Sequence, residues 1–78
     1  MGMKEQILAN LKEQWKMAVR NQYQADPEKV KNANIEKNAD EIMSNPIVRR
    51  TAKQVGITIE DIKRILTEIR DEVAMEGK

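Results

Sequence analysis

The sequence predicts an all-α fold, a small bundle of four helices or of five, in a single domain that spans residues 1–78. Good helix formers dominate the chain, which has only 3 glycines and 2 prolines. Apolar residues recur at spacings of three and four, as they do along one face of a helix. The β-branched residues never alternate with polar ones in the way that strands require. With 1 Trp and 1 Tyr as the aromatic residues, the core is expected to be mainly aliphatic.

The first helix is expected from about Met3 to about Gln24. Its stripe follows the three-four spacing and consists of Ile7, Leu8, Leu11, Trp15, Ala18, Val19 and Gln22/Tyr23. We interpret Trp15 as a core anchor, because a large apolar ring in such a stripe is the best available filler. The other interpretation, a platform on which a nucleic-acid base stacks, requires neighbouring aromatic residues. Tyr23 is too isolated to serve as one.

The second helix is expected to begin at Pro27, because Asp26 can cap free amides and proline suits the first helical position. It would then run to about Met43. Asparagines at 32, 34 and 38 disfavour a helix interior, since their amides compete for the backbone. The alternative is therefore a break near Asn34, with Asn34 capping a further short helix, and this would give five helices.

A short third helix is expected from Pro46 to Val55, with Asn45 as its cap. Gly56 then marks a sharp corner, because glycine readily adopts the positive φ that follows many helix ends. The last helix is expected from Ile59 to about Met75, with Gly77 after its end.

Thr58 and Asp61 have the spacing of a capping box at the start of this last helix. The helix carries a long apolar seam, which predicts packing on the first helix or, alternatively, a homodimer through this helix. The seam consists of Ile59, Ile62, Ile65, Leu66, Ile69 and Val73.

The stretch from Val48 to Thr67 resembles helix-turn-helix DNA-binding domains in general, over about twenty residues. The resemblance lies in the small Ala52 between helices, Gly56 in the turn and branched apolar residues after it. In that family the first helix crosses the nucleic-acid backbone and the second presents its first residues to the groove. The resemblance thus implies binding of DNA, and less so of RNA, through Arg49, Arg50, Lys53, Thr58, Lys63 and Arg64.

Composition argues against several other classes of protein. The chain has 0 cysteines and 0 histidines, so it lacks the usual nucleophile, general base and soft metal ligands. We therefore expect no enzyme, no catalytic residue, no metal site and no cofactor. The absence of a long apolar run predicts a protein without a membrane span, and the absence of cysteine fits the cytoplasm. The net charge of +1 argues against strong non-specific binding of polyanions.

Two hypotheses of function follow from these patterns. The first is a small non-enzymatic nucleic-acid-binding or regulatory protein that uses the helix-turn-helix-like element. The second is a helical module that binds another protein, with an apolar helix face docking a partner helix and no nucleic acid involved.

Overall fold

A computed structural model of the chain describes residues 2–77, and it divides this range into five helices. The predicted all-α class is confirmed. The helices are α1 (Met3–Ala25), α2 (Pro27–Lys31), α3 (Ile35–Ser44), α4 (Pro46–Val55) and α5 (Ile59–Glu76). Within the described range, none of them combines the length and the apolar character that a membrane span requires.

The break near Asn34 is present, so the expectation of one continuous helix to about Met43 is wrong. The chain leaves helical geometry after Lys31, and the side chain of Asn34 accepts a hydrogen bond of 3.0 Å from the backbone N–H of Lys37. Asn34 therefore caps a new helix instead of continuing the old one, as expected of a side chain that competes for backbone groups.

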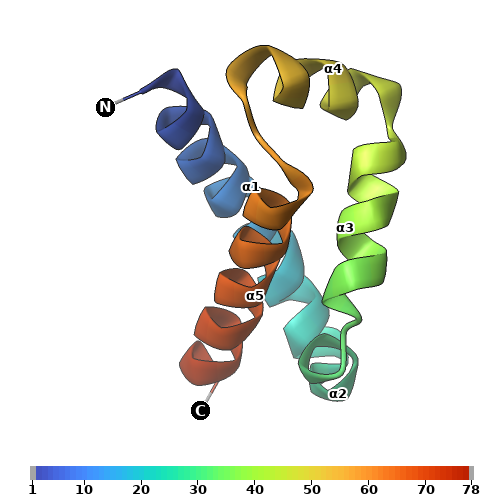
Figure 1. The fold of residues 1–78 in the computed structure, drawn as a ribbon. Coiled ribbons are helices and arrows are strands. Elements are labelled where there is room, and N and C mark those ends of the chain that lie inside the picture. Colours follow the sequence, from blue (N-terminus) through green and yellow to red (C-terminus); the bar gives the residue numbers. More distant parts are fainter. Residues whose placement is uncertain (1, 78) are drawn as a thin grey trace.

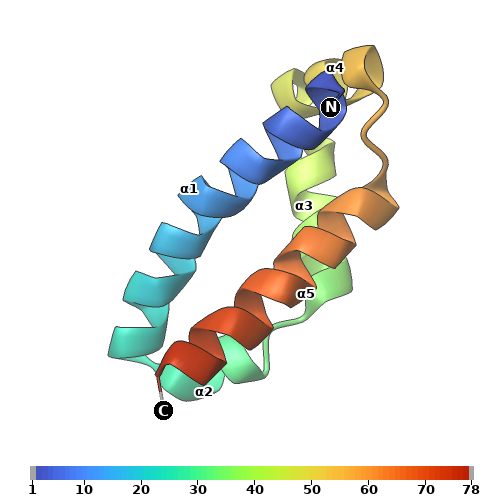
Figure 2. The same cartoon turned by 90° about the vertical axis from the view of Figure 1, so that its left-hand side faces the viewer.

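Helices α1 and α5 lie side by side and run in the same direction (Figure 2). Three hydrogen-bonded ion pairs join them, and the partners in each are 56 positions apart in the sequence. A constant offset is possible only when the two helices are parallel. We call these pairs the ion-pair ladder; its rungs are Lys12–Glu68, Lys16–Glu72 and Arg20–Glu76.

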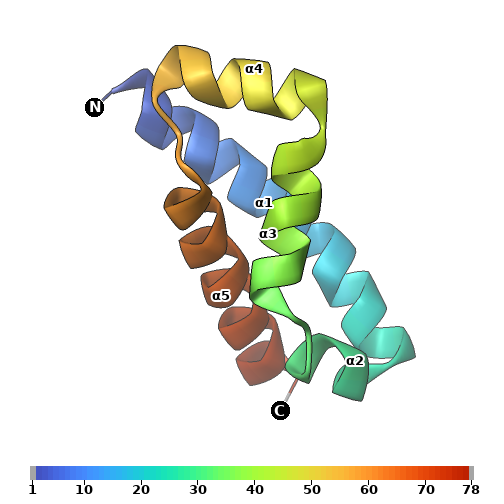
Figure 3. The ribbon, with the colours of Figure 1, turned by 45° about the vertical axis from the view of Figure 1, so that its right-hand side comes forward.

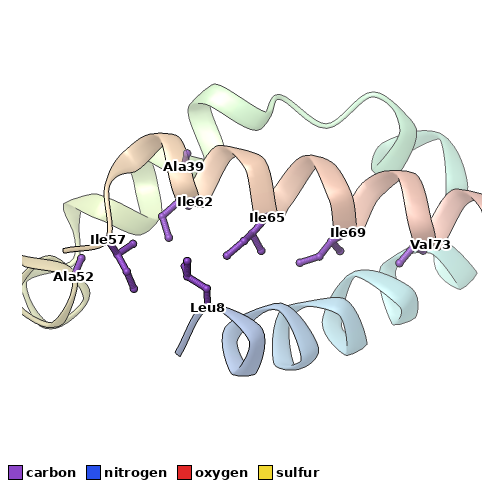
Figure 4. Packing of buried hydrophobic residues seen from close by; sticks show 8 residues of the cluster. All are labelled: Leu8, Ala39, Ala52, Ile57, Ile62, Ile65, Ile69 and Val73. Carbon is purple, nitrogen blue, oxygen red and sulfur yellow. The ribbon is translucent and has the colours of Figure 1, made fainter. Parts of the chain in front are cut away.

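The core is built around α5. Ile65, Ile69 and Val73 are almost fully buried and point from α5 toward α1, where Leu8 meets the same cluster (Figure 4). Ala39 of α3, which has no exposed surface, packs against this cluster from the other side of α5. The apolar seam of the last helix therefore packs on α1 and α3 of the same chain, and the predicted packing on the first helix is confirmed.

The corner at Gly56 is present as predicted. Gly56 has φ 80°, the left-handed conformation, and the backbone N–H of Ile57 closes the turn on the carbonyl of Ala52 at 2.8 Å. The side chain of Thr58 accepts a hydrogen bond from the backbone N–H of Asp61, and Asp61 accepts one in return from the backbone N–H of Thr58. This reciprocal capping box separates α4 and α5 into two rods.

The path from α1 back to the start of α5 leads through the three short helices. From α2 the chain runs along α3, crosses at α4 and returns in α5, so that α3 is antiparallel to α5 (Figures 1 and 3). Both α1 and α3 pack on α5, but they are not closely packed on each other. A space therefore remains between these two helices.

Candidate functional site

A groove of about 730 Å³ lies between α1 and α3. One wall comes from α1 with Ala18 and Val19, and the opposite wall comes from α3 with Ile42. Leu66 of α5 contributes between the walls, and α2 lies at one end with the buried Val30. Val48 of α4 lines it as well, so all five helices provide apolar side chains to one open depression.

A smaller pocket of about 160 Å³ lies between α1 and α4. Ile7 and Leu11 line it from α1, and Ile47 lines it from α4. Ile47 is 77% exposed, so this large apolar side chain lies at the rim and is not part of the packed core. Most of the residues that line this pocket are apolar, and it therefore extends the apolar part of the groove between α1 and α3.

The two depressions share Trp15 and Val48, and together we call them the interhelical groove. Along α1 it extends from Ile7 to Gln22, which corresponds to about 22 Å at the rise of an α-helix. Trp15 is half-buried at the middle of this length, packed against the core and facing the groove as well. The interpretation of Trp15 as a core anchor is therefore correct but incomplete.

The groove has the chemistry of a binding surface. Its polar lining is rich in side-chain amides, among them Gln22 and Asn38, whereas its ionisable lining residues are Lys29, Glu41 and Arg70. Amides can donate and accept hydrogen bonds but are poor acids and bases. Within residues 2–77 no cluster of three or more His, Cys, Asp or Glu side chains could hold a metal ion. The groove can therefore bury the apolar surface of a ligand, and its side-chain amides can orient that ligand by hydrogen bonds.

The cations predicted on the first helix of the helix-turn-helix-like element lie on α4. Arg50 and Lys53 are exposed, and neither forms an ion pair with a carboxylate of residues 2–77. Arg49 is also exposed, but its Nε donates a hydrogen bond of 3.3 Å to the carbonyl of Met43 at the end of α3. Arg50 and Lys53 are one turn apart and form a small cationic face.

The residues predicted at the start of the second helix have partners of their own. The hydroxyl of Thr58 is used in the capping box with Asp61. Nζ of Lys63 lies 3.7 Å from Glu60, and Nη2 of Arg64 lies 3.6 Å from Asp61. Carboxylates of the same helix turn thus compensate both cations, although these exposed pairs are weak.

Asp61 is the most strongly held carboxylate of this turn. Hydrogen bonds from the backbone N–H of Thr58 and from the ammonium group of Lys4 hold the pKa of the Asp61 carboxyl below its usual value. The Lys4–Asp61 ion pair, at 3.0 Å, also ties the start of α1 to the start of α5. A negative charge therefore persists where a nucleic-acid phosphate would approach the end of the helix.

The homodimer predicted through the last helix would need an apolar face that is free. Ile62, Ile65 and Ile69 are buried within the single chain, and Ile59 and Leu66 are half-buried. A second chain could reach most of this seam only after α5 had separated from α1 and α3.

The groove does not follow from the sequence pattern, although several of its residues belong to the predicted stripe of the first helix. Ile7, Leu11 and Ala18 have the spacing of core residues in that stripe. The feature of the sequence that indicates a groove is the width of that stripe, which covers two adjacent faces of α1. The ladder cations Lys12 and Lys16 flank one of these faces, and this leaves the other face for a different contact.

No protein-family model, curated protein or solved structure matches this chain.

Proposed function

We propose that the chain is a non-enzymatic interaction module that binds an apolar helix face of a protein partner in the interhelical groove. The observation that carries this proposal is the apolar lining that α1 provides between Ile7 and Val19, which includes the half-buried Trp15. Protein-binding sites have this character, with an aromatic side chain in a concave apolar surface and polar groups at its rim.

A helix is the occupant that suits these walls. Helical ligands lie in grooves between helices and insert apolar side chains at helix spacing, whereas an extended peptide usually adds to a sheet edge. The described residues form no strand that could offer such an edge. A length of about 22 Å corresponds to about four helical turns of the ligand.

The test is a titration of the protein with a neutral amphipathic peptide of about four turns, with leucine at helix-spaced positions. Trp15 is the only tryptophan and reports on the groove by its fluorescence. We expect a saturable shift of its emission to shorter wavelength. The variant Ala18→Gln places a larger side chain in the groove and should weaken binding by about tenfold, or about 1.4 kcal/mol.

Ala9→Gln is the matched control, since Ala9 is also an exposed alanine of α1 but does not line the groove. It should bind the peptide as the unaltered protein does. The proposal fails if the emission of Trp15 does not change, or if both variants bind equally well.

Nucleic-acid binding is a second candidate, and the cationic face of α4 favours it. Arg50 and Lys53 are exposed, and no acidic residue occurs in the sequence between Pro46 and Ile59. Under this proposal Arg49, Arg50 and Lys53 contact phosphates, and Thr58, Lys63 and Arg64 approach the DNA from the start of α5.

The corresponding test is the fluorescence anisotropy of a labelled DNA duplex at about 50 mM salt. An Arg50→Ala/Lys53→Ala variant should lose affinity and show a salt slope that is smaller by about two. A Lys31→Ala/Lys37→Ala variant removes two exposed lysines elsewhere and serves as the control. Equal affinity of all three proteins would contradict the nucleic-acid proposal.

A further inference from the structure

We infer that the pocket between α1 and α4 is the anchor site of the interhelical groove and takes one phenylalanine side chain of the bound helix, an inference that depends on the proposed interaction module. The pocket has a volume of about 160 Å³. An apolar protein cavity of about 150 Å³ is large enough to hold one benzene molecule. The pocket therefore matches a single six-membered ring in size, whereas an indole ring is too large for it and an alanine leaves it empty.

The lining of the pocket is apolar on nearly every side. Its base belongs to the packed core, where Ala52, Ile57 and Ile62 are buried. Among the described residues that line it, only Thr51 and Trp15 carry a polar side-chain atom, and none is ionisable. A charged or amide side chain would give up its hydrogen bonds to water here without replacing them, which is unfavourable. The chemistry that suits the pocket is therefore an uncharged hydrocarbon group.

Trp15 favours an aromatic ring as this group. Its half-buried indole lines both the pocket and the rest of the groove. Two aromatic rings attract each other in offset or edge-to-face arrangements, beyond the gain from the apolar area that they bury. Large side chains that fill such pockets supply most of the binding energy of many protein interfaces. One ring of the ligand would thus bind more tightly here than an aliphatic side chain does.

α4 is held over the pocket by contacts at both of its ends. It spans from α3 to α5 (Figure 1) and, among the described residues, packs closely on α3 but not on α1. The side chain of Asn45 accepts a hydrogen bond of 2.9 Å from the backbone N–H of Ile47. At the other end, the backbone N–H of Ile57 donates to the carbonyl of Ala52 at 2.8 Å. A shift of α4 toward α1 has to disturb these contacts, so the pocket stays open beside Ile47, which is 77% exposed.

The pocket lies at one end of the groove. Ile7 and Leu11 line it near the start of α1, whereas Ala18 and Gln22 line the groove nearer the end of that helix. A helix that fills the groove therefore places one of its terminal turns against the pocket, and no other turn. We expect the phenylalanine in that turn.

The first experiment tests the pocket without a peptide. Benzene is added to protein with ¹³C-labelled isoleucine and leucine methyl groups, and the methyl chemical shifts are followed by NMR. We expect saturable changes at Ile7, Leu11 and Ile47, which line the pocket. Ile59, which lines neither depression, should not change.

Two variants of α4 provide the comparison. Thr51→Phe places a ring on the wall of the pocket itself and should abolish the changes caused by benzene. Gln54→Phe adds the same ring at an exposed position of α4 outside the pocket and should leave them as they are. The helical content of both variants is checked by circular dichroism.

The second experiment uses the neutral amphipathic peptide of about four turns, with each of its leucines replaced in turn by phenylalanine. Phenylalanine in one terminal turn should bind about tenfold more tightly than alanine at the same position, and tryptophan there should bind less tightly than phenylalanine. Phenylalanine in the other turns should give no such gain. Thr51→Phe should remove the gain, and Gln54→Phe should keep it.

Several results would overturn the inference, and they differ from failure of the module. Absence of any change at Ile7 and Ile47 on addition of benzene would refute the anchor site, even if leucine peptides bind through Ala18. A gain that is equal at every position, or that survives Thr51→Phe, would refute it as well. Methyl shifts that change on dilution of the protein alone would make a second copy of the chain the occupant. Binding of benzene without any peptide that depends on Ala18 would refute the module, and with it the phenylalanine anchor, but not the apolar pocket.

Discussion

Lys16 and Glu72 fix the register between the first and the last helix, with Nζ of Lys16 2.9 Å from Oε1 of Glu72. The offset of 56 between them recurs in the other two rungs of the ladder, so α1 and α5 run parallel. A parallel pair of helices needs a return path, and here α2, α3 and α4 provide it. The groove is a consequence of that path, because α3 returns along α5 without closing onto α1.

Glu72→Lys should destabilise the protein at low salt, because it places a third cation beside Lys12 and Lys16. The measurement is the midpoint of urea unfolding by circular dichroism. The loss should shrink in about 1 M NaCl, where the Debye length is about 3 Å. Glu13→Lys, an exposed change on α1 outside the ladder, is the control. An equal effect of both variants would show that the ladder does not contribute.

Ile69→Ala should lower the free energy of unfolding by about 2–5 kcal/mol, because Ile69 is 1% exposed and its truncation leaves a cavity. Ile47→Ala makes the same chemical change at a side chain that is 77% exposed, and should cost less than about 0.5 kcal/mol. Urea unfolding of both variants gives the comparison. Similar losses would mean that Ile47 is packed in solution.

Gly56→Ala should cost about 1 kcal/mol through backbone strain, since Gly56 has φ 80° and a Cβ there would meet no atom within 4 Å. Gly56→Asn should cost less, because asparagine tolerates the left-handed conformation better than alanine. The midpoints of thermal unfolding of the two variants distinguish backbone strain from a steric clash, because the larger asparagine would be the less stable variant if a clash were the cause. If the alanine variant is as stable as the unaltered protein, the corner is not held in this conformation.

Asp61→Asn should lower stability at neutral pH, because it replaces the charged acceptor for the backbone N–H of Thr58 by a neutral amide and removes the ionic partner of Lys4. The pKa of the Asp61 carboxyl is lowered in the folded state by the backbone N–H of Thr58 and then by Lys4. Its contribution to stability is therefore complete above the unfolded pKa of about 3.9 and is lost as the pH falls through the lower folded value.

The difference between Asp61→Asn and the unaltered protein should accordingly shrink as the pH is lowered through this range. Asp40→Asn, an exposed change on α3, should show no such convergence. Urea midpoints at pH 7 and at about pH 3 are the measurement. A difference that stays constant with pH would rule out the carboxylate as its source.

The local structure could be predicted from the sequence wherever short-range chemistry decides it. Gly56, Thr58 and Asp61 predicted a corner and a capped helix, and Asn34 offered the break that the structure contains. These features depend on residues three or four positions apart, so the sequence pattern is enough to identify them.

The groove could not be predicted in the same way, because it depends on helices that are distant in sequence. A stripe containing Ile7, Leu11 and Ala18 looks the same whether another helix covers all of it or only part of it. Only the parallel register of α1 and α5 decides which face of Trp15 is packed and which faces the groove. The spacing of four in Lys12, Lys16 and Arg20, matched by that in Glu68, Glu72 and Glu76, was the available sign of this register.

The most direct test of the proposed function is a map of backbone amide chemical shifts by NMR, recorded as the neutral amphipathic peptide of about four turns is added. The largest changes should fall on Ala18, Ile42 and Leu66, which line the groove from three helices, and on the indole N–H of Trp15. Changes confined to Arg50, Lys53 and Arg64, with Trp15 unaffected, would contradict the groove as the binding site.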